Sequence, residues 1–484
     1  MHPNFFATIH ATLSAHPDRV LVVWPAACAG QAPATYTGGA LLLRIEAGRA
    51  ALRAQGVRPG QPVLLARPVS FELICLLLAV MSLGAVPVLP PAGASALGLW
   101  RVARRSKIRQ ALVAPALPWP ARLLARALGL RLSADSGALP APAPAWTAQR
   151  VAAGQPALIS HSSGSTGPAK PIRRSHRVLQ AQHEALRQAF PPLPGQRDFP
   201  LFPNVLLHNL AAGVCTLLPD VAWGAPARLE PARIVRQLRQ QGVQTLTGNV
   251  FYFARLADYL TAVPTALPAV VALGVGGSPV PEGLMRRLAQ LFAQARCYVI
   301  YGSSEAEPIA VRQLTDAAGL PEAGYCVGPI LPALSWRLHP LGAVWVGAGR
   351  PLAQVGELQV KGAHVATAAP DGWLSTGDFG YLDADGRLCL TGRQGNEAIR
   401  QQQQHYQLEH VLQHLPGVAR VAARPGRRGF VVYVEPAAGA VVAEAAVRAA
   451  LAVFPGPVCE QVHFRRRLPV DSRHLSKIRY GAVR

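Results

Sequence analysis

Apolar segments of two lengths alternate along the first part of the chain. Residues 39–57 and 71–85 carry apolar side chains at helical spacing, and short runs such as 62–67, apolar almost throughout, stand between them. A short run without polar alternation is typical of a strand buried on both faces, and strands that alternate with helices at this spacing build parallel sheets. The pattern therefore predicts a doubly wound α/β sheet.

The same alternation returns after an Ala- and Pro-rich connector at 136–157 and continues to an apolar strand at 297–302. The texture then changes to short segments with turn signals between them, as in 372–393, which indicate antiparallel hairpins. A helix, two strands and another helix follow. We therefore expect an α/β protein with a large N-terminal domain, residues 1–392, of doubly wound sheets plus a β-rich subdomain, and a small α+β C-terminal domain, residues 393–484.

The charge of the chain limits the classes of molecule that we expect it to bind. The 484 residues include 48 Lys and Arg against 25 Asp and Glu, a net charge of +23, but the arginines are scattered and no aromatic stripe accompanies them. Nucleic-acid-binding proteins gather such charges on one face or within a recognisable motif, so we expect no nucleic-acid partner. A basic surface also suits the phosphates of small molecules or an acidic partner protein.

Cysteines and apolar runs bear on the location of the protein. Seven cysteines lie far apart without a C-x-x-C pair, which favours a reduced, cytoplasmic protein that lacks a disulfide framework. No charged and apolar secretory signal opens the sequence. The most apolar run, 72–91, contains Glu72, Gly84 and two prolines at its end, so we expect a buried helix, a turn and a strand there and no membrane span.

A stretch rich in serine and glycine, SHSSGSTGPAK at 160–170, could be a nucleophilic serine site, a phosphate-binding loop or a flexible linker. It contains no G-x-S-x-G, which a nucleophilic serine on a strand-to-helix turn requires. Gly164 and Gly167 stand too close together for a Walker loop, and Pro171 rather than Ser or Thr follows Lys170. Small residues, hydroxyls and one lysine can still wrap a phosphate chain. From these residues alone, a phosphate-binding loop and a flexible linker both stay open.

Polar residues also follow the strand at 297–302. Tyr301 and Gly302 end this strand and Ser304 and Glu305 come directly after it, which places a carboxylate at the carboxyl end of a sheet strand. A carboxylate in that position can bind Mg²⁺ on phosphate oxygens. Taken alone, it could equally be an ordinary surface acid.

Two further positions and a basic segment carry candidate chemistry. Asp378 stands between Gly377 and an aromatic residue and can accept hydrogen bonds from two ribose hydroxyls, with Arg393 as a second contact. Lys477 belongs to the basic segment 468–479. Each of these residues taken alone would more often serve in a turn or on the surface.

Two further patterns give only weak evidence for a binding site. The glycine-rich segment 273–281 does not match G-x-G-x-x-G, because Pro279 occupies the last position, so a dinucleotide site is not expected. His410 and His414 are one helical turn apart, as zinc ligands often are, but they lack the Glu of an H-E-x-x-H motif and any obvious third ligand. An exposed helix face is expected there instead.

Five segments, taken in order, resemble the motifs of the adenylate-forming superfamily, which includes acyl-CoA synthetases, luciferases and nonribosomal-peptide adenylation domains. SSGSTGPAKP resembles its phosphate loop, YGSSE its Tyr-Gly-x-Thr-Glu motif with Ser304 at the Thr position, and STGD its ribose-binding motif. TGR resembles the junction with the C-terminal domain and SKIR the terminal lysine motif. The resemblance covers roughly residues 20–484 and implies that the C-terminal domain is mobile.

The resemblance also implies ATP and Mg²⁺ as cofactors and gives each position a role. Lys477 would bridge the acid and the α-phosphate, Glu305 would bind Mg²⁺, and Ser304 would complete the catalytic set. The residues expected to contact ATP are Ser162, Ser163, Gly164, Ser165, Thr166, Gly167 and Lys170 at the phosphates, Gly276, Gly277 and Tyr301 beside the adenine, Asp378 and Arg393 at the ribose, and Gly302, which directly follows Tyr301. The residues expected in the acid pocket are His208, Asn249 and Gly276.

The activity implied by the resemblance is ATP-dependent activation of a fatty or aryl acid as an acyl adenylate, with release of pyrophosphate. Transfer to a thiol, of CoA or of the phosphopantetheine on an acyl carrier protein, would follow. Two departures bear on this second step. Gly395 stands where the family usually has an acidic or Lys hinge residue, and 399–409 differs from the usual basic-x-x-Gly segment that shapes the thiol channel.

Two segments point to an alternative second step. LPVDSRHLSKI, at 468–478, and the segment 198–213 are similar to the β-lactone synthetases of olefin biosynthesis. This similarity implies that the hydroxyl of a β-hydroxy acyl adenylate closes a four-membered ring without CoA. A non-catalytic binding protein of the same fold is a third possibility, against which the retained Lys477, Glu305 and Asp378 argue.

Overall fold

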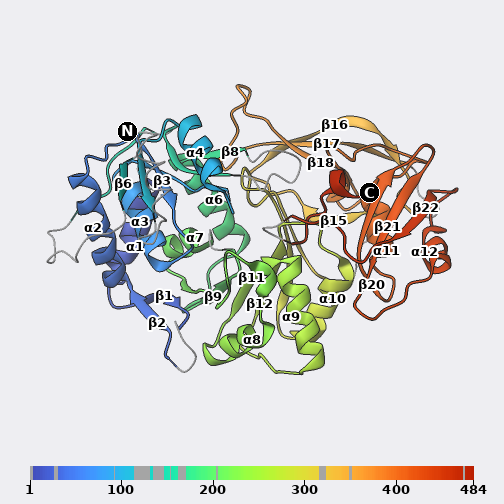
Figure 1. The fold of residues 1–484 in the computed structure, drawn as a ribbon, viewed down its shortest axis with the longest axis horizontal. Helices are drawn as coiled ribbons and strands as arrows, with labels where there is room; N and C mark the ends of the chain where they lie inside the picture. Colours follow the sequence, from blue (N-terminus) through green and yellow to red (C-terminus); the bar gives the residue numbers. More distant parts are fainter. Residues whose placement is uncertain are drawn as a thin grey trace. The chain divides into compact units, whose positions relative to one another are not determined.

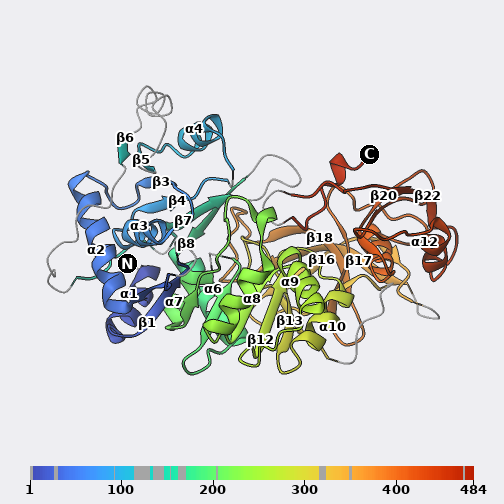
Figure 2. The same cartoon turned by 60° about the horizontal axis from the view of Figure 1, so that its bottom comes forward.

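The computed structural model describes residues 4–26, 31–91, 93–113, 131–133, 146–152, 154–161, 170–202, 205–315, 323–347, 352–471 and 475–484. The chain forms two compact units, traced from blue to red in Figures 1 and 2. The first unit holds the described residues up to 245, and the second holds those from 246 onward.

A six-stranded sheet lies in the first unit, with the order β6-β5-β3-β4-β7-β8. All neighbouring pairs in it are parallel except β7 and β8, which form an antiparallel hairpin. The strands are β3 (Pro62–Ala66), β4 (Val86–Val88), β5 (Gln110–Val113), β6 (Arg131–Ser133), β7 (Pro156–His161) and β8 (Pro171–Ser175).

A second group of strands in this unit runs in the order β9-β10-β1-β2, with β9, β10 and β1 parallel and β2 antiparallel to β1. These strands are β1 (Val20–Trp24), β2 (Ala34–Thr37), β9 (Arg197–Pro200) and β10 (Cys215–Leu217). The helices of the unit are α1 (Phe5–Ala15), α2 (Gly38–Ala54), α3 (Phe71–Ser82), α4 (Ala96–Arg105), α6 (His176–Ala189), α7 (Val205–Ala212) and α8 (Pro231–Gln240), with a 3₁₀ turn η1 (Pro226–Arg228).

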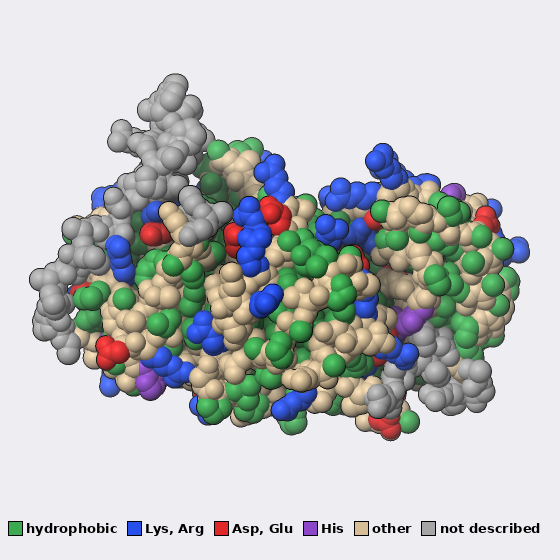
Figure 3. Space-filling view, turned by 90° about the horizontal axis from the view of Figure 1, so that it is seen from below, with side chains coloured by type: hydrophobic (Ala, Val, Ile, Leu, Met, Phe, Trp, Pro, Cys, Tyr) green, Lys and Arg blue, Asp and Glu red, His purple; other side chains and the backbone are tan. Residues whose placement is uncertain are grey.

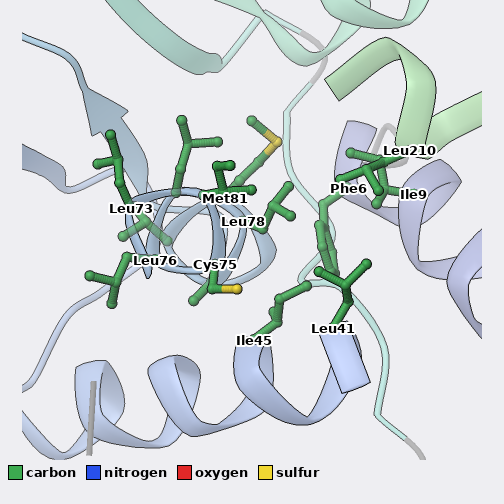
Figure 4. Packing of buried hydrophobic residues seen from close by; sticks show 14 of the residues in the cluster. Phe6, Ile9, Leu41, Ile45, Leu73, Cys75, Leu76, Leu78, Met81 and Leu210 are labelled. Atoms are coloured by element: carbon green, nitrogen blue, oxygen red, sulfur yellow. The ribbon is translucent and has the colours of Figure 1, made fainter. Parts of the chain in front are cut away.

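Helix α3 forms the centre of the first unit's core. It begins where the Ser70 hydroxyl accepts a hydrogen bond from the Leu73 backbone, and all of its residues but Glu72 are buried. Figure 4 shows side chains of α3 packed among Leu41 and Ile45 of α2 and residues of α1 and α7. The run 72–91 is thus a buried helix, a turn and strand β4, as its sequence predicts. None of the described helices combines the length and the hydropathy needed to cross a membrane.

The second unit opens with four strands in the order β14-β13-β12-β11. Strands β12 and β13 are parallel, and β14 is antiparallel to β13. The elements are β11 (Thr245–Asn249), which starts at the boundary, β12 (Ala272–Gly276), β13 (Arg296–Tyr301) and β14 (Ala310–Gln313), with helices α9 (Val250–Ala262) and α10 (Glu282–Leu291).

An antiparallel five-stranded sheet follows in the order β15-β19-β18-β17-β16, as the hairpin signals predict. Its strands are β15 (Tyr325–Pro329), β16 (Ser335–Val344), β17 (Ala353–Lys361), β18 (Leu374–Leu382) and β19 (Arg387–Arg393). This sheet is the β-rich subdomain of the sequence prediction.

Beyond β19 the chain builds a separate three-stranded sheet in the order β20-β21-β22 with its own hydrophobic core. The elements are α11 (His405–Leu412), β20 (Val418–Pro425), β21 (Phe430–Pro436), α12 (Glu444–Leu451), β22 (Cys459–Phe464) and the 3₁₀ turn η3 (Tyr480–Ala482). The predicted α/β fold class with a small α+β C-terminal part is therefore confirmed. The domain boundary at 392 and the mobility of the last part stay predictions.

The surface charge matches the scattered arginines of the sequence. On the face drawn in Figure 3, Lys and Arg side chains lie in small groups separated by apolar and neutral surface. Among the described side chains on that face, they form no continuous basic stripe.

Candidate functional site

Three residues predicted as ATP contacts meet in the second unit. Asp378 of β18 and Arg393 of β19 are direct partners across the antiparallel pair, and Arg393 Nη1 lies 2.6 Å from Asp378 Oδ1. The Tyr301 hydroxyl, at the end of β13, donates a 2.8 Å hydrogen bond to Asp378 Oδ2. Sheet register thus joins Asp378 to Arg393, and a side-chain hydrogen bond adds Tyr301 from a different sheet.

The charge state of this cluster follows from its environment. Removal from water and the neighbouring Asp378 carboxylate raise the pKa of Tyr301 well above its usual value, so the phenol stays a hydrogen-bond donor. The Asp378 carboxylate raises the pKa of Arg393 as well. Each carboxylate oxygen of Asp378 accepts one hydrogen bond, from Tyr301 or from Arg393, and an ionised carboxylate offers about four lone-pair sites. Acceptor capacity therefore remains for further donors.

The segment of β18 before Asp378 positions its carboxylate. Gly377 has φ +72°, a left-handed conformation that favours glycine, and its N–H donates to Glu357 Oε1 over 3.2 Å. The Thr376 hydroxyl accepts a 3.1 Å hydrogen bond from the Asp378 N–H and donates one of 2.8 Å to the Leu358 carbonyl. The S-T-G-D sequence is thus a locally hydrogen-bonded, irregular segment of strand β18 that presents the carboxylate.

Glu305 lies in a tight turn at the carboxyl end of β13. The Ser303 N–H donates to the Ala306 carbonyl over 2.8 Å, and the Ala306 N–H donates back to Ser303 over 3.1 Å, which leaves Ser304 and Glu305 at the tip. The Ala366 N–H fixes the Glu305 carbonyl at 2.7 Å. The Glu305 side chain is partly exposed on this fixed backbone, and an oxygen ligand of this kind suits a hard cation such as Mg²⁺.

Glycines complete the ends of the two central strands. A Cβ atom on Gly276 would lie 2.5 Å from the Ile300 carbonyl oxygen, and one on Gly302 would lie 2.8 Å from the Ala306 carbonyl oxygen. Gly277 has φ +82°. These close approaches require glycine, and the absence of side chains at these three positions leaves a surface that a flat ring can approach.

Two of the three residues expected in the acid pocket have hydrogen-bonding partners within the protein. Asn249 is the N-cap of α9, where its Oδ1 accepts a 3.0 Å hydrogen bond from the Tyr252 N–H, and it is almost fully buried. In the first unit, His208 Nδ1 lies 2.9 Å from His183 Nδ1. Burial and the charges of His183 and Arg187 lower the pKa of His208 to about 3, so this imidazole is neutral at physiological pH.

Most of the predicted phosphate loop, Ser162 to Gly167, lies outside the described residues. Its flanks are described: His161 pairs with Pro171 across the hairpin of β7 and β8, and Lys170 is exposed beside it. Strand β8 therefore stands between the loop and helix α6.

Lys477 lies in a loop that Asp471 holds together. The Asp471 N–H donates a 2.9 Å hydrogen bond to the Lys477 carbonyl, and Asp471 Oδ1 accepts a 3.1 Å hydrogen bond from the Lys477 N–H. Val470 and Ile478 form a β-bridge directly beside these bonds. The backbone of Lys477 is thus held by Asp471, and its side chain is half-buried.

One sequence interpretation is wrong. His410 is buried, 4% exposed, with its ring 4.6 Å from the Tyr325 ring, whereas only His414 is exposed as expected. The same helix, α11, buries Glu409, which accepts hydrogen bonds from the Tyr480 hydroxyl and the Ala423 N–H. Sequence reasoning missed this cluster, because its members are up to 155 residues apart and meet only when α11 packs on β15 and β20 and Tyr480 reaches Glu409.

Comparison with known proteins gives a consistent family match. The sequence model of the family described as AMP-binding enzyme matches residues 9–368. The chain is 30% identical over 347 residues to an olefin beta-lactone synthetase of Xanthomonas campestris pv. campestris and 32% identical over 346 residues to one of Stenotrophomonas maltophilia. Each match covers 63% of this chain and 62% of the relative, so the similarity spans less than two thirds of those proteins.

Solved structures share the fold over the whole chain. The O-succinylbenzoate coenzyme A synthetase MenE of Bacillus subtilis, in complex with ATP and a magnesium ion, superposes with a TM-score of 0.79 and covers 100% of this chain and 99% of its own. At 17% sequence identity, this likeness concerns the fold alone.

Proposed function

Because this chain belongs to the AMP-binding enzyme family of the adenylate-forming superfamily, we propose that it uses ATP to activate a carboxylic acid as an acyl adenylate, with release of pyrophosphate. The observation that carries the proposal is the Asp378 carboxylate, held by Tyr301 and Arg393 with acceptor capacity to spare. Two ribose hydroxyls are donors that fit this capacity.

The chemistry requires positioning more than proton transfer. The oxygen of an ionised carboxylate attacks the α-phosphorus, the bond to the pyrophosphate oxygen breaks, and no general base is needed because the nucleophile already carries its charge. Two anions must approach each other, so the protein has to supply cations and hydrogen-bond donors. In this proposal Lys477 bridges the acid and the α-phosphate, and Lys170 with the loop before it binds the phosphate chain.

The remaining residues bind the nucleotide and its metal. Asp378 and Arg393 hold the ribose, and Gly276, Gly277, Tyr301 and Gly302 border the adenine. Glu305, with Ser304 beside it, is an oxygen ligand on a fixed turn that fits Mg²⁺. When bound, the ion would neutralise charge on the phosphate oxygens.

For the second step, ring closure of a β-hydroxy acyl adenylate is our first choice. In this reaction the hydroxyl oxygen attacks the acyl carbon, AMP leaves with the bonding electrons, and the hydroxyl proton passes to solvent or a base. The proposal is supported by two relatives that are olefin beta-lactone synthetases and by the ending LPVDSRHLSKI at 468–478. It requires neither CoA nor a carrier protein.

Transfer of the acyl group to a thiol is the second candidate. It is supported by the net charge of +23, which suits the phosphates of CoA or an acidic acyl carrier protein. Location and partner class are a separate part of the proposal. The free cysteines support a cytoplasmic location, and the scattered arginines support small-molecule partners and no nucleic acid.

The test is acid-dependent pyrophosphate exchange across fatty, β-hydroxy and aryl acids, followed by product analysis with and without CoA. We expect exchange with at least one β-hydroxy acid and a lactone product that forms equally in the absence of CoA. An acyl-CoA product, formed only when CoA is present, would replace ring closure with thiol transfer. Folded protein without exchange for any acid would favour a binding protein and overturn the adenylation proposal.

A further inference from the structure

Two thiols face each other in the β-rich sheet of the second unit. Cys326 of β15 and Cys389 of β19 are direct partners across an antiparallel pair. Their sulfurs and a carboxylate oxygen of Asp383 all lie within 4.8 Å of one another. Both cysteines are free thiols in the structure.

Register alone brings this pair within bonding range. Directly opposite residues in an antiparallel pair have Cα atoms about 4.5–5.5 Å apart, and a disulfide needs a Cα separation of about 4.4–6.8 Å. The other described cysteines whose strand partners are known face different residues: Cys215 pairs with Arg197, Cys297 with Leu273 and Cys459 with Phe430. In the part of the chain that the structure describes, Cys326 and Cys389 are thus the register-paired thiols.

The surroundings of the pair favour a thiolate on one sulfur. The pKa of Cys326 is lowered, first because Cys389 donates a hydrogen bond to it and further because the charges of Arg312 and Arg387 attract the anion. The pKa of Cys389 is raised, because it is the donor in that hydrogen bond and is buried. Cys326 is partly exposed and Cys389 is 3% exposed, so an oxidant reaches the ionised sulfur first.

A metal site is the other use of such a cluster, and the charges oppose it. Asp383 Oδ1 accepts hydrogen bonds of 3.0 and 2.9 Å from the N–H groups of Asp385 and Arg387, and Oδ2 lies 2.8 Å from Arg387 Nε. The carboxylate is therefore committed to the β18–β19 turn. Two arginine charges beside the thiols would further repel a divalent cation.

We propose that Cys326 and Cys389 are a redox modification site, whose two thiols are converted reversibly into a disulfide that links β15 to β19. Hydrogen peroxide is the oxidant class. The Cys326 thiolate attacks one peroxide oxygen, the O–O bond breaks, hydroxide leaves, and Cys326 becomes a sulfenic acid. Cys389 sulfur then attacks Cys326 sulfur, the S–O bond breaks, and water leaves with the Cys389 proton. A dithiol reductant reverses the change by thiol–disulfide exchange.

The disulfide would join two strands that also carry Arg393, of the proposed nucleotide site, and Tyr325, which contacts α11. Strand β19 also carries Arg393, the partner of Asp378, and Tyr325, beside Cys326, packs its ring against Tyr406 and His410 of α11. A cross-link at this position closes a long loop of chain and so restricts the unfolded state. We therefore expect the oxidised protein to melt at a higher temperature than the reduced one.

The experiment uses the full chain, reduced and then freed of reductant. It is treated with a few equivalents of hydrogen peroxide, the remaining thiols are alkylated, and the peptides are mapped by mass spectrometry. We expect a linked pair of peptides that contain residues 326 and 389, lighter by two hydrogen atoms, and the loss of two alkylated thiols, both reversed by dithiothreitol. C326S and C389S should each abolish the link, while C459S, which changes a partly exposed cysteine opposite Phe430, should retain it.

Two results overturn the proposal. One is oxidation of other thiols to completion while Cys326 and Cys389 remain separately alkylatable in the wild-type chain, a result that needs no variant to fold. The other is binding of one Zn²⁺ per reduced chain that shields both thiols from alkylation and is lost in C326S and C389S, with no peroxide-induced link. This second result would make the cluster a metal site. Neither result bears on acid activation.

Discussion

Asp378 and Arg393 face each other across β18 and β19, and their charged groups are 2.6 Å apart. The pair exists because of a β-bulge: Gly380 pairs with Leu390, and the same register continued would place Gly392 opposite Asp378. The irregularity between Phe379 and Gly380 shifts the register by one residue and brings the guanidinium to the carboxylate instead. The nucleotide site that we propose depends on this shift.

The Asp378 carboxylate is the first test of that site. We expect D378N to weaken ATP binding and to lower the rate of pyrophosphate exchange at fixed ATP by about tenfold to a hundredfold, the cost of losing hydrogen bonds to a charged group. Calorimetric titration with ATP and the exchange assay measure the two effects. D385N, which changes an exposed aspartate in the next turn, is the control and should bind as the wild type does. Equal ATP affinity for D378N and wild type would remove Asp378 from the ribose site.

Lys477 should act on chemistry more than on binding. Asp471 holds this residue through its backbone atoms, so K477A is expected to keep the loop and to retain ATP affinity. Adenylation should fall by about a hundredfold or more, as when one preorganised charge contact to a transition state is removed. R479A changes an exposed basic residue two positions further on and should leave exchange unaffected. Full exchange activity in K477A would show that the terminal-lysine assignment is wrong.

Local signals explain which parts of the fold and site were predictable. The apolar run after Ser70 carries its own N-cap and its own burial pattern, so α3 follows from the sequence. The STGD and TGR motifs likewise mark Asp378 and Arg393. Their pairing depends on a bulge that has no comparable sequence signal.

The burial of polar residues in the part of the chain after β19 was not predictable from the sequence for a related reason. His410 has the sequence appearance of an exposed helical residue, and it is buried only because α11 packs against Tyr325 of β15. Cys326 and Cys389 meet through strand pairing across a long stretch of chain. Contacts of this kind are decided by tertiary packing, which residue spacing does not encode.

Gly276 tests the close approach at the strand ends. A Cβ on this residue would lie 2.5 Å from the Ile300 carbonyl oxygen, so G276A has to push β12 and β13 apart. We expect a loss of about 1–3 kcal/mol in the free energy of unfolding, as for other overpacked sites, together with weaker ATP binding. In the control G283A the added methyl meets no atom within 4 Å and stands in helix α10, so stability should be unchanged or slightly higher. Wild-type stability and ATP affinity in G276A would contradict the steric argument.

The core around α3 gives a prediction about stability alone. Leu78 is 0% exposed at the centre of the cluster in Figure 4, and L78A should lower the free energy of unfolding by about 2–5 kcal/mol because it leaves a cavity. Leu97 of α4 is 51% exposed, so L97A should cost little. Urea denaturation of both variants measures the difference. Similar losses for the two variants would show that the α3 cluster is not the core described above.

Glu409 makes the stability of the last part depend on pH. It is 2% exposed, and burial raises the pKa of its carboxyl from 4.5 to about 8, although hydrogen bonds from Ala423 and Tyr480 oppose the shift. Between these two values the folded chain keeps a proton that the unfolded chain has lost, so the stabilising contribution is complete below about pH 4.5 and is lost as pH rises through about 8. The slope for one such group is about 1.4 kcal/mol per pH unit, so a loss of a few kcal/mol is expected across the window.

The variant E409Q tests this pH dependence, because its side chain cannot titrate. Urea denaturation at several pH values between 5.5 and 8.5 should show a flatter dependence of the free energy of unfolding for this variant. E444Q, which changes an exposed glutamate of α12, should follow the wild-type slope, and an identical slope for E409Q would mean that the buried carboxyl does not retain its proton.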